Sequence, residues 1–252
     1  MDQNNLNLQL DLTKVANKTY DDLASKTLKS TGNAGSTVVD FLHNFILYPL
    51  QKYNIYAEYK LQNYKDELVK KANKIPKESL TLPRVNIFGP TLEGLKYNLD
   101  EQYIKDMFTN ILISDMDSTK QSKVLPAYID IVRQLSKDDA IFLKSLKECS
   151  SYVRGFFCIE LHNKDKYILL EYSDNNGKLS DFNIIKLNSI VIDNLIRLRL
   201  IEIPDRVFVN QKVYDKMYEL LHQPTMIEVI QYTPRILSVT DFGKNFIDIC
   251  LS

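Results

Sequence analysis

The chain has 252 residues, of which 44% are hydrophobic and 25% charged, a composition that is ordinary for a globular protein of one or two domains. Its 32 basic and 32 acidic residues cancel, which speaks against a nucleic-acid binder, because such proteins usually carry a basic excess. Seven glycines and three widely spaced cysteines supply neither phosphate-cradling loops nor a disulfide or zinc framework. The N-terminus lacks a basic start followed by an apolar core, so we expect no signal peptide and a cytoplasmic protein.

The N-terminal part of the chain predicts a polar arm followed by helices. Residues 1–35 are polar and uneven, and Ser36 is a suitable N-cap for a helix that begins after it. From Thr37 to Lys74 apolar residues recur at helical spacing, and Pro49 is expected to kink or split this run. The apolar stretch 38–50 is too short and too often interrupted to span a bilayer, which takes about 20 residues. We expect it to be buried, with attachment to a membrane surface as an open alternative.

Tyrosines crowd the second half of this helical region, among lysines. A tyrosine side chain has an apolar body and a polar tip, which suits it to protein interfaces. Two other interpretations stay open: stacking on single-stranded nucleic acid, or tyrosines that line a pair of helices. The candidate interaction surface consists of Tyr53, Tyr56, Tyr59, Lys60 and Tyr64.

The central part of the chain predicts a small helical bundle. Residues 75–90 contain three prolines and predict an extended connection, with Pro90 in the first turn of a short helix that reaches Tyr97. Asn98 or Asp100 is expected to cap the main helix, which ends near Met116. The apolar stripe of this helix has i, i+3, i+4 spacing and consists of Tyr103, Ile104, Met107, Phe108, Ile111 and Leu112.

Two further helices are expected after this main helix. The first runs from about Val124 to Leu135. The second opens on Ser136 and Asp139, whose spacing is that of a capping box. The core side of that second helix is predicted to carry Ala140, Phe142, Leu143 and Leu146.

After Ser150 the period changes to that of strands mixed with helices. We expect a hairpin of 153–161 with 167–172, and a second hairpin of 227–232 with 236–239 across Thr233-Pro234. Helices are predicted at 187–198, at 213–221 and at 241–251, the last of them capped by Thr240.

These elements predict a mainly α protein with a helical bundle in its N-terminal and central parts and a C-terminal α+β lobe. The expected organisation is an arm at 1–35, a helical domain at 36–150 and an α+β domain at 151–252. The order of elements after Leu187 predicts a winged-helix-like lobe, a fold that often binds DNA. From Gly155 onward, however, 11 basic residues face 13 acidic ones, so we favour a protein-contact module over a DNA-binding one.

No catalytic, cofactor-binding or metal-ligating constellation emerges from the motifs. Asp115 and Asp117 are two residues apart, so they do not share a helix face and do not form an acid/base pair. We expect them to end the helix and to cap the loop that follows. Asp138-Asp139 suits the first turn of a helix. The histidines and cysteines stand alone, without the partner that a base or a thiolate needs, and Cys250 reads as a core residue. These isolated residues are His43, His162, His222, Cys149, Cys158 and Cys250.

Residues 36–252 resemble the abortive infection alpha family of bacterial proteins. The matching pieces are Leu82-Pro83, Pro90, Leu92, Leu95, Asp100, Met107-Phe108, Ile111-Leu112, Ser114, Met116-Asp117, Pro126, Gln134-Leu135-Ser136 and Asp139-Ala140, with the C-terminal segments NLIRLRLIEI and ILSVTDFGKNFIDIC. The chain departs from the family pattern at Leu125, where a histidine is frequent, and at Arg199, where a glycine is frequent. If that glycine ends a helix with positive φ, the turn at Arg199 must be built differently.

The resemblance implies defence against phage of the abortive-infection kind. We expect a non-enzymatic protein that contacts a phage or host protein, without cofactor or metal, and we leave self-association open. The alternatives are a winged-helix DNA-binding regulator and a membrane-surface effector that uses the apolar helix 38–50.

Overall fold

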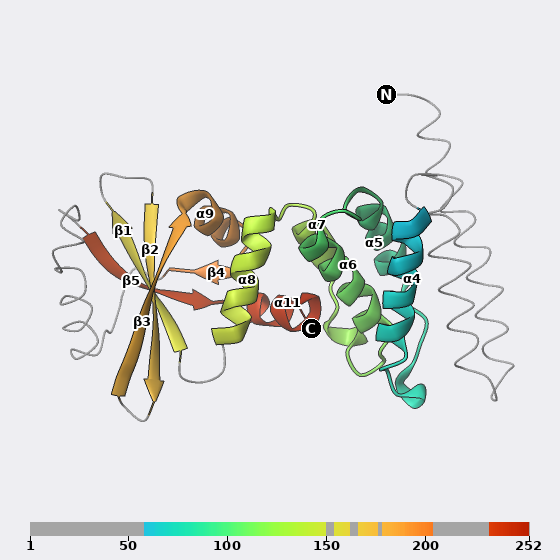
Figure 1. Ribbon diagram of the computed structural model, residues 1–252. Coiled ribbons are helices and arrows are strands. Elements are labelled where there is room, and N and C mark those ends of the chain that lie inside the picture. Colours follow the sequence, from blue (N-terminus) through green and yellow to red (C-terminus); the bar gives the residue numbers. More distant parts are fainter. Residues whose placement is uncertain (1–57, 150–153, 162–165, 176–177, 204–231, 252) are drawn as a thin grey trace, which may run out of the picture. The chain divides into compact units, whose positions relative to one another are not determined.

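The computed structural model describes residues 58–149, 154–161, 166–175, 178–203 and 232–251 (Figure 1). The chain divides into two compact units, one of residues 1–134 with 249–252 and one of residues 135–248. The division falls just before the helix that opens at Lys137, whereas the sequence places the boundary after that helix, at residue 150.

The described part of the first unit is a bundle of helices joined by short links. Its elements are α4 (Glu58–Ala72), η3 (Lys77–Ser79), α5 (Val85–Tyr97), α6 (Gln102–Asp115), η4 (Gln121–Lys123) and α7 (Ala127–Val132). A single bridge, Leu80↔Asp117, ties the strand-like link after η3 to the residues that come after α6.

Helix α6 is the central helix of this bundle, as the sequence predicts. Five of the six residues of the predicted stripe are buried; Tyr103 is half-buried. Helix α5 approaches α6 closely at Gly94, because a Cβ atom there would lie 2.4 Å from the ring of Phe108. A helix packed this tightly gains from the dispersion contacts that any larger side chain at residue 94 would disrupt.

Three predictions about the bounds of these helices are wrong. Helix α5 begins at Val85, not at Pro90, so Pro90 lies inside the helix. The N-cap of α6 is Glu101 and not Asn98 or Asp100; Asn98 instead ends α5 and donates from its side chain to the Gly94 carbonyl. The helix expected from Val124 to Leu135 is the shorter α7.

The second unit combines helices with a five-stranded antiparallel sheet. Its strands lie in the order β3-β2-β1-β5-β4. The elements are α8 (Lys137–Cys149), β1 (Arg154–Leu161), β2 (Lys166–Asn175), β3 (Lys178–Asn188), α9 (Ser189–Arg197), β4 (Ile201–Glu202), β5 (Tyr232–Val239) and α11 (Asp241–Cys250), the last two residues of which belong to the first unit.

The first predicted hairpin is confirmed as β1 and β2, but the rest of the sheet differs from expectation. The sequence does not predict β3, and the second hairpin is wrong, because Tyr232–Val239 form one strand. Pro234 lies inside β5, and at this point β1 is its only neighbour among the described strands, a position in which proline is tolerated.

The cap of α8 is confirmed. The Ser136 N–H donates to Asp139 Oδ2 at 2.7 Å, and the Asp139 N–H donates to Ser136 Oγ at 3.2 Å, which is the reciprocal pair of a capping box. The four predicted core residues of α8 are buried.

The fold class, mainly α with a C-terminal α+β part, is therefore confirmed. The helix predicted at 213–221, on which the winged-helix interpretation depends, lies outside the described residues. The winged helix stays a prediction.

Candidate functional site

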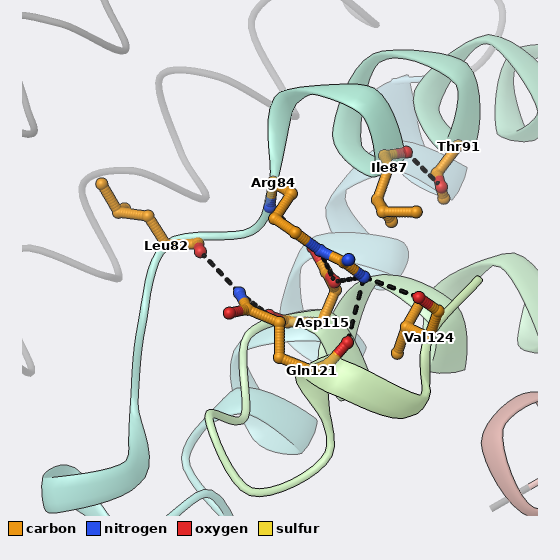
Figure 2. Close-up of polar contacts among 7 residues, drawn as sticks. All are labelled: Leu82, Arg84, Ile87, Thr91, Asp115, Gln121 and Val124. Atoms are coloured by element: carbon orange, nitrogen blue, oxygen red, sulfur yellow. Dashed lines mark hydrogen bonds and ion pairs between the residues drawn. The ribbon is translucent and has the colours of Figure 1, made fainter. Parts of the chain in front are cut away.

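The motif-bearing segments of the first unit meet around Arg84 (Figure 2). Arg84 is the N-cap residue of α5 and comes directly after Leu82-Pro83. Asp115 is the last residue of α6, and Gln121 and Val124 belong to the turn of η4. We call this set of residues, Leu82, Arg84, Asp115, Gln121 and Val124, the Arg84 clamp.

Arg84 binds the carboxylate of Asp115 through its backbone and its side chain together. The Arg84 N–H donates to Asp115 Oδ2 at 2.6 Å. From the side chain, Nε and Nη2 donate to Oδ1 at 2.8 and 2.6 Å. The two side-chain donors share one carboxylate oxygen and the backbone N–H takes the other, so these charge-assisted bonds fix the direction of both groups.

The same guanidinium also closes the turn after α6. Arg84 Nη2 donates to the carbonyls of Gln121 at 3.0 Å and Val124 at 2.7 Å. The Gln121 side-chain amide donates in turn to the carbonyls of Leu82 at 3.3 Å and Asp115 at 2.8 Å. Three separate segments of the chain are thus held by one set of hydrogen bonds.

The position of Asp115 explains why it needs a cation. Its side chain is fully buried, and a carboxylate at the C-terminal end of a helix meets the negative end of the macrodipole. Burial raises the pKa of the Asp115 carboxyl, and the hydrogen bonds and charge of Arg84 oppose that rise. The chemistry of the clamp is that of a structural tie: both carboxylate oxygens are bound by Arg84.

Asp117 has the loop-capping role that the sequence predicts. Its Oδ1 accepts from the Thr119 N–H at 3.0 Å and from the Thr119 hydroxyl at 2.6 Å. This is a local turn contact of the kind that aspartate makes with residues two positions ahead.

A second polar cluster joins α4 to α6. The Glu67 carboxylate lies 3.5 Å from Lys71 Nζ and 3.3 Å from Lys105 Nζ. Lys71 also donates to Asn110 Oδ1 at 2.8 Å, and Asn110 donates to the Cys250 carbonyl at 2.9 Å. The cluster therefore fixes α4, α6 and the last residues of the chain.

Tyr64 lies in the core next to this cluster and not on a surface. Its side chain is buried, and its hydroxyl lies 3.3 Å from that of Thr109, which donates to the Lys105 carbonyl. Burial raises the pKa of the Tyr64 phenol. The prediction of an interaction surface is thus wrong for Tyr64, because this residue falls on the apolar face of α4 with Leu68 and Ala72. Of the interpretations that the sequence leaves open, tyrosine between paired helices fits it.

The structure leaves the remaining members of the predicted surface untested. Tyr53 and Tyr56 lie outside the described residues, and Tyr59 and Lys60 belong to α4 without a described side chain. The structure also leaves most of the isolated histidines and cysteines untested. The three histidines lie outside the described residues, and the side chains of Cys149 and Cys158 are not described.

Cys250 is a core residue, as predicted. Its side chain is fully buried, and burial raises the pKa of the thiol well above the usual 9.0. A protonated, inaccessible thiol is a poor nucleophile.

The C-terminal motif segments meet in the second unit, where α9 ends and α11 begins. Helix α9 ends in a Schellman motif: the Leu200 N–H donates to the Leu195 carbonyl, and the Arg199 N–H donates to the Ile196 carbonyl. Arg199 itself takes the left-handed conformation, with φ of 60°. The expectation of a differently built turn is therefore wrong, because the arginine adopts the backbone that favours glycine.

Thr240 joins this turn to α11. Its hydroxyl donates to the Arg199 carbonyl at 2.6 Å and accepts from the Gly243 N–H at 2.8 Å, so Thr240 is the predicted N-cap. A Cβ atom at Gly243 would lie 1.9 Å from the Leu200 carbonyl oxygen, so only glycine fits there. We call Arg199, Leu200, Thr240 and Gly243 the Thr240 corner.

The described residues supply neither a metal cluster nor a membrane span. Among them, no group of three or more His, Cys, Asp or Glu side chains is arranged to hold a metal ion. No helix in the described ranges has the length and apolarity needed to cross a bilayer, and the apolar stretch 38–50 lies outside them.

Comparison with known proteins gives one match. A protein-family profile described as abortive infection alpha matches residues 56–250. No curated protein and no solved structure matches the chain.

Proposed function

Because this chain belongs to the abortive infection alpha family, we propose that it protects cells against phage by binding a phage or host protein, and not by catalysis. The match over residues 56–250 suggests anti-phage defence of the abortive-infection kind. The proposal adds the mode of action: a folded scaffold whose exposed helical residues make the contact.

The observation that carries the proposal is the bonding of the Arg84 clamp. Asp115 is the most deeply buried acidic residue in the described part of the first unit, and Arg84 occupies both of its oxygens. A general acid or base needs a free proton site that faces a substrate. The clamp instead uses its polar groups to hold α5, α6 and the η4 turn together.

Two partly exposed apolar residues adjoin the clamp in sequence. Val85 comes directly after Arg84, and Leu125 directly after Val124, whose carbonyl Arg84 binds. Each is 38% exposed, so the clamp presents two branched apolar residues to solvent. Exposed apolar residues on a rigid base are what a protein partner buries when it binds.

A phage challenge tests the proposal. Cells that express the protein are expected to lower the plating efficiency of a sensitive phage. The double variant Val85→Ser with Leu125→Ser is expected to lose protection while its expression level and circular dichroism spectrum stay unchanged. Serine removes the apolar contact area without disturbing the buried bonds of Arg84.

Ile141→Ser is the matched control, because Ile141 is an exposed branched residue of the second unit, 41% exposed on α8. Full protection by the double variant at normal expression would contradict the proposed contact surface. The predicted surface residues Tyr56 and Tyr59 are tested alongside, as alanine variants in the same assay. If all of these variants protect fully, action through these helical surfaces is ruled out.

A further inference from the structure

Two segments of the first unit that lie side by side carry a set of exposed lysines. Residues 74–84 lead from the end of α4 to the start of α5, and residues 117–124 come after α6. The two segments are bonded together, for example through the Gln121 side chain, which donates to the Leu82 carbonyl at 3.3 Å (Figure 2). We call their four exposed lysines the lysine surface: Lys74, Lys77, Lys120 and Lys123.

Exposed carboxylates of the same segments do not balance these lysines. The two segments contain two acidic residues, Glu78, which is exposed, and Asp117, which is buried. Within the described residues, Lys74, Lys77 and Lys120 form no ion pair. The two segments therefore present four exposed positive charges and one exposed negative charge, although the total charge of the chain is zero.

The lysines of the two segments are close enough to one another to act on one partner. The Ser118 N–H donates to the Ser79 carbonyl at 2.8 Å. Lys77 lies two residues from Ser79, and Lys120 lies two residues from Ser118. At ~3.5 Å per residue, the Cα atoms of the two lysines are at most about 20 Å apart. A protein interface of standard size covers ~800 Å² on each partner, which spans this separation.

We propose that the lysine surface, together with Val85 and Leu125, binds an acidic segment of the partner protein. This inference rests on the proposed function and adds the chemistry of the partner, in which carboxylates alternate with apolar side chains. The two exposed apolar residues adjoin the lysine-bearing segments, because Val85 follows Arg84 and Leu125 follows Val124. An acidic partner supplies the complementary charge, which speeds association and selects against other proteins.

Two other anionic partners agree less well with these observations. A nucleic acid is bound largely through its phosphates, which offer Val85 and Leu125 no apolar contact, and the chain lacks the basic excess of nucleic-acid binders. Segments that bind an anionic membrane usually combine cations with aromatic anchors such as tryptophan or phenylalanine. Residues 74–84 and 117–124 contain no aromatic residue.

Fluorescence anisotropy of labelled peptides, titrated with the full chain, tests the proposal. One peptide repeats the sequence Glu-Glu-Leu, and a second peptide of equal length and charge repeats Glu-Glu-Ser. We expect the leucine peptide to bind more tightly than the serine peptide. Its binding is expected to weaken as salt rises from about 0.05 M to about 0.5 M, because salt screens exposed charges.

Three results of this titration contradict the proposal. The first is no binding of the leucine peptide, and the second is equal binding of the two peptides. The third is tighter binding of duplex DNA or of phosphatidylserine vesicles than of the leucine peptide at the same salt concentration, which would assign the lysine surface to a nucleic acid or a membrane.

Charge reversal locates the binding surface. Lys77→Glu with Lys120→Glu replaces two attractions by two repulsions and is expected to raise the dissociation constant of the leucine peptide about tenfold. The control is Lys137→Glu with Lys144→Glu, two exposed lysines of α8 in the second unit, which changes the net charge by the same amount. It is expected to raise the constant less than about threefold. Equal effects of the two double variants would mean that net charge, and not the lysine surface, sets binding.

The phage challenge separates this inference from the proposed function. If Val85→Ser with Leu125→Ser loses protection while Lys77→Glu with Lys120→Glu keeps it, the proposed function stands and the acidic partner is wrong. If the unchanged chain gives no protection but binds the leucine peptide through the lysine surface, the preference for acidic segments stands and the proposed function fails. Loss of protection in both double variants, with unchanged circular dichroism spectra and full protection by the α8 control, supports both.

Discussion

The two units fix their helices by different means. In the first unit, a buried carboxylate at the end of α6 is held by Arg84, which reaches across from the start of α5. In the second unit, the end of α9 and the start of α11 meet through backbone geometry: a left-handed residue, a threonine cap and a glycine with no room for a side chain. At the Arg84 clamp a charge pair joins the two helices, whereas at the Thr240 corner close backbone approach joins them.

This difference predicts how each unit tolerates substitution. A buried ion pair is costly when one partner is removed, because the group left behind loses its compensation. A close backbone contact is costly when atoms are added, because no side chain can rotate away from a carbonyl oxygen. We therefore expect the Arg84 clamp to be destabilised when a side chain is truncated. We expect the Thr240 corner to be destabilised when a side chain is enlarged.

The largest effect is expected for Asp115→Ala. The change removes the carboxylate that accepts from the Arg84 N–H, Nε and Nη2, while Nη2 keeps the carbonyls of Gln121 and Val124. We expect a loss of about 3 kcal/mol in the free energy of unfolding, near the low end for a broken buried pair, because the Arg84 side chain is 37% exposed and regains water. Urea unfolding followed by circular dichroism measures the loss.

Asp130→Ala is the control for this variant. Asp130 also pairs with an arginine, Arg133 at 3.6 Å, but its side chain is 71% exposed. Its removal is expected to cost less than about 0.5 kcal/mol. Hydrogen exchange is expected to rise around residues 82–124 in Asp115→Ala alone. Equal losses in the two variants would show that burial does not set the strength of the clamp.

The next effect is expected for Gly243→Ala. An added Cβ lies 1.9 Å from the Leu200 carbonyl oxygen, so α11 and the end of α9 must move apart. The intrinsic preference of helices for alanine offsets part of the cost. We expect a net loss of about 2 kcal/mol and faster hydrogen exchange around residues 195–202 and 238–247.

Lys244→Ala serves as its control, because the Lys244 side chain is 63% exposed and its ion pair is with an exposed aspartate one turn earlier. This change is expected to alter stability by less than about 0.5 kcal/mol. A stable Gly243→Ala variant with unchanged exchange would mean that the two helices do not need this close approach.

Local signals in the sequence account for the parts of the fold that could be predicted. The stripe of α6, the capping box of Ser136 and Asp139, and the Thr240 cap all depend on residues within about two turns of one another. Whether such a stripe or cap forms depends on the spacing of the residues, which can be taken directly from the sequence.

The features that were not predicted are of two kinds. Some depend on residues that are far apart in the sequence, and others depart from the usual preference of a residue type. Arg84 and Asp115 are 31 residues apart, and no spacing rule connects a helix start with the end of another helix. Thr233-Pro234 is a turn signal, yet both residues lie inside β5, where β1 is the only described strand beside them. No sequence signal marks Arg84, because the helix that follows it is expected to begin at Pro90 and not at Val85.

The smallest effect, and the only gain, is expected for Arg199→Gly. Arg199 has φ of 60°, a conformation that costs a residue with a Cβ about 1–2 kcal/mol and costs glycine little. The greater freedom of glycine in the unfolded chain cancels part of this gain. We expect the free energy of unfolding to rise by about 0.5–1 kcal/mol in urea titrations.

Arg197→Gly is the comparison, since Arg197 is the last residue of α9, is exposed, and donates from its guanidinium to Asn194 Oδ1 at 2.7 Å. The same change there is expected to lose about 1 kcal/mol, because glycine is unfavourable inside a helix. If the free energy of unfolding rises in Arg199→Gly and falls in Arg197→Gly, backbone geometry and not the arginine charge sets stability at the Thr240 corner. If Arg199→Gly also loses stability, the exposed arginine side chain makes a contact that outweighs its strained backbone, and charge would act in the second unit as it does in the first.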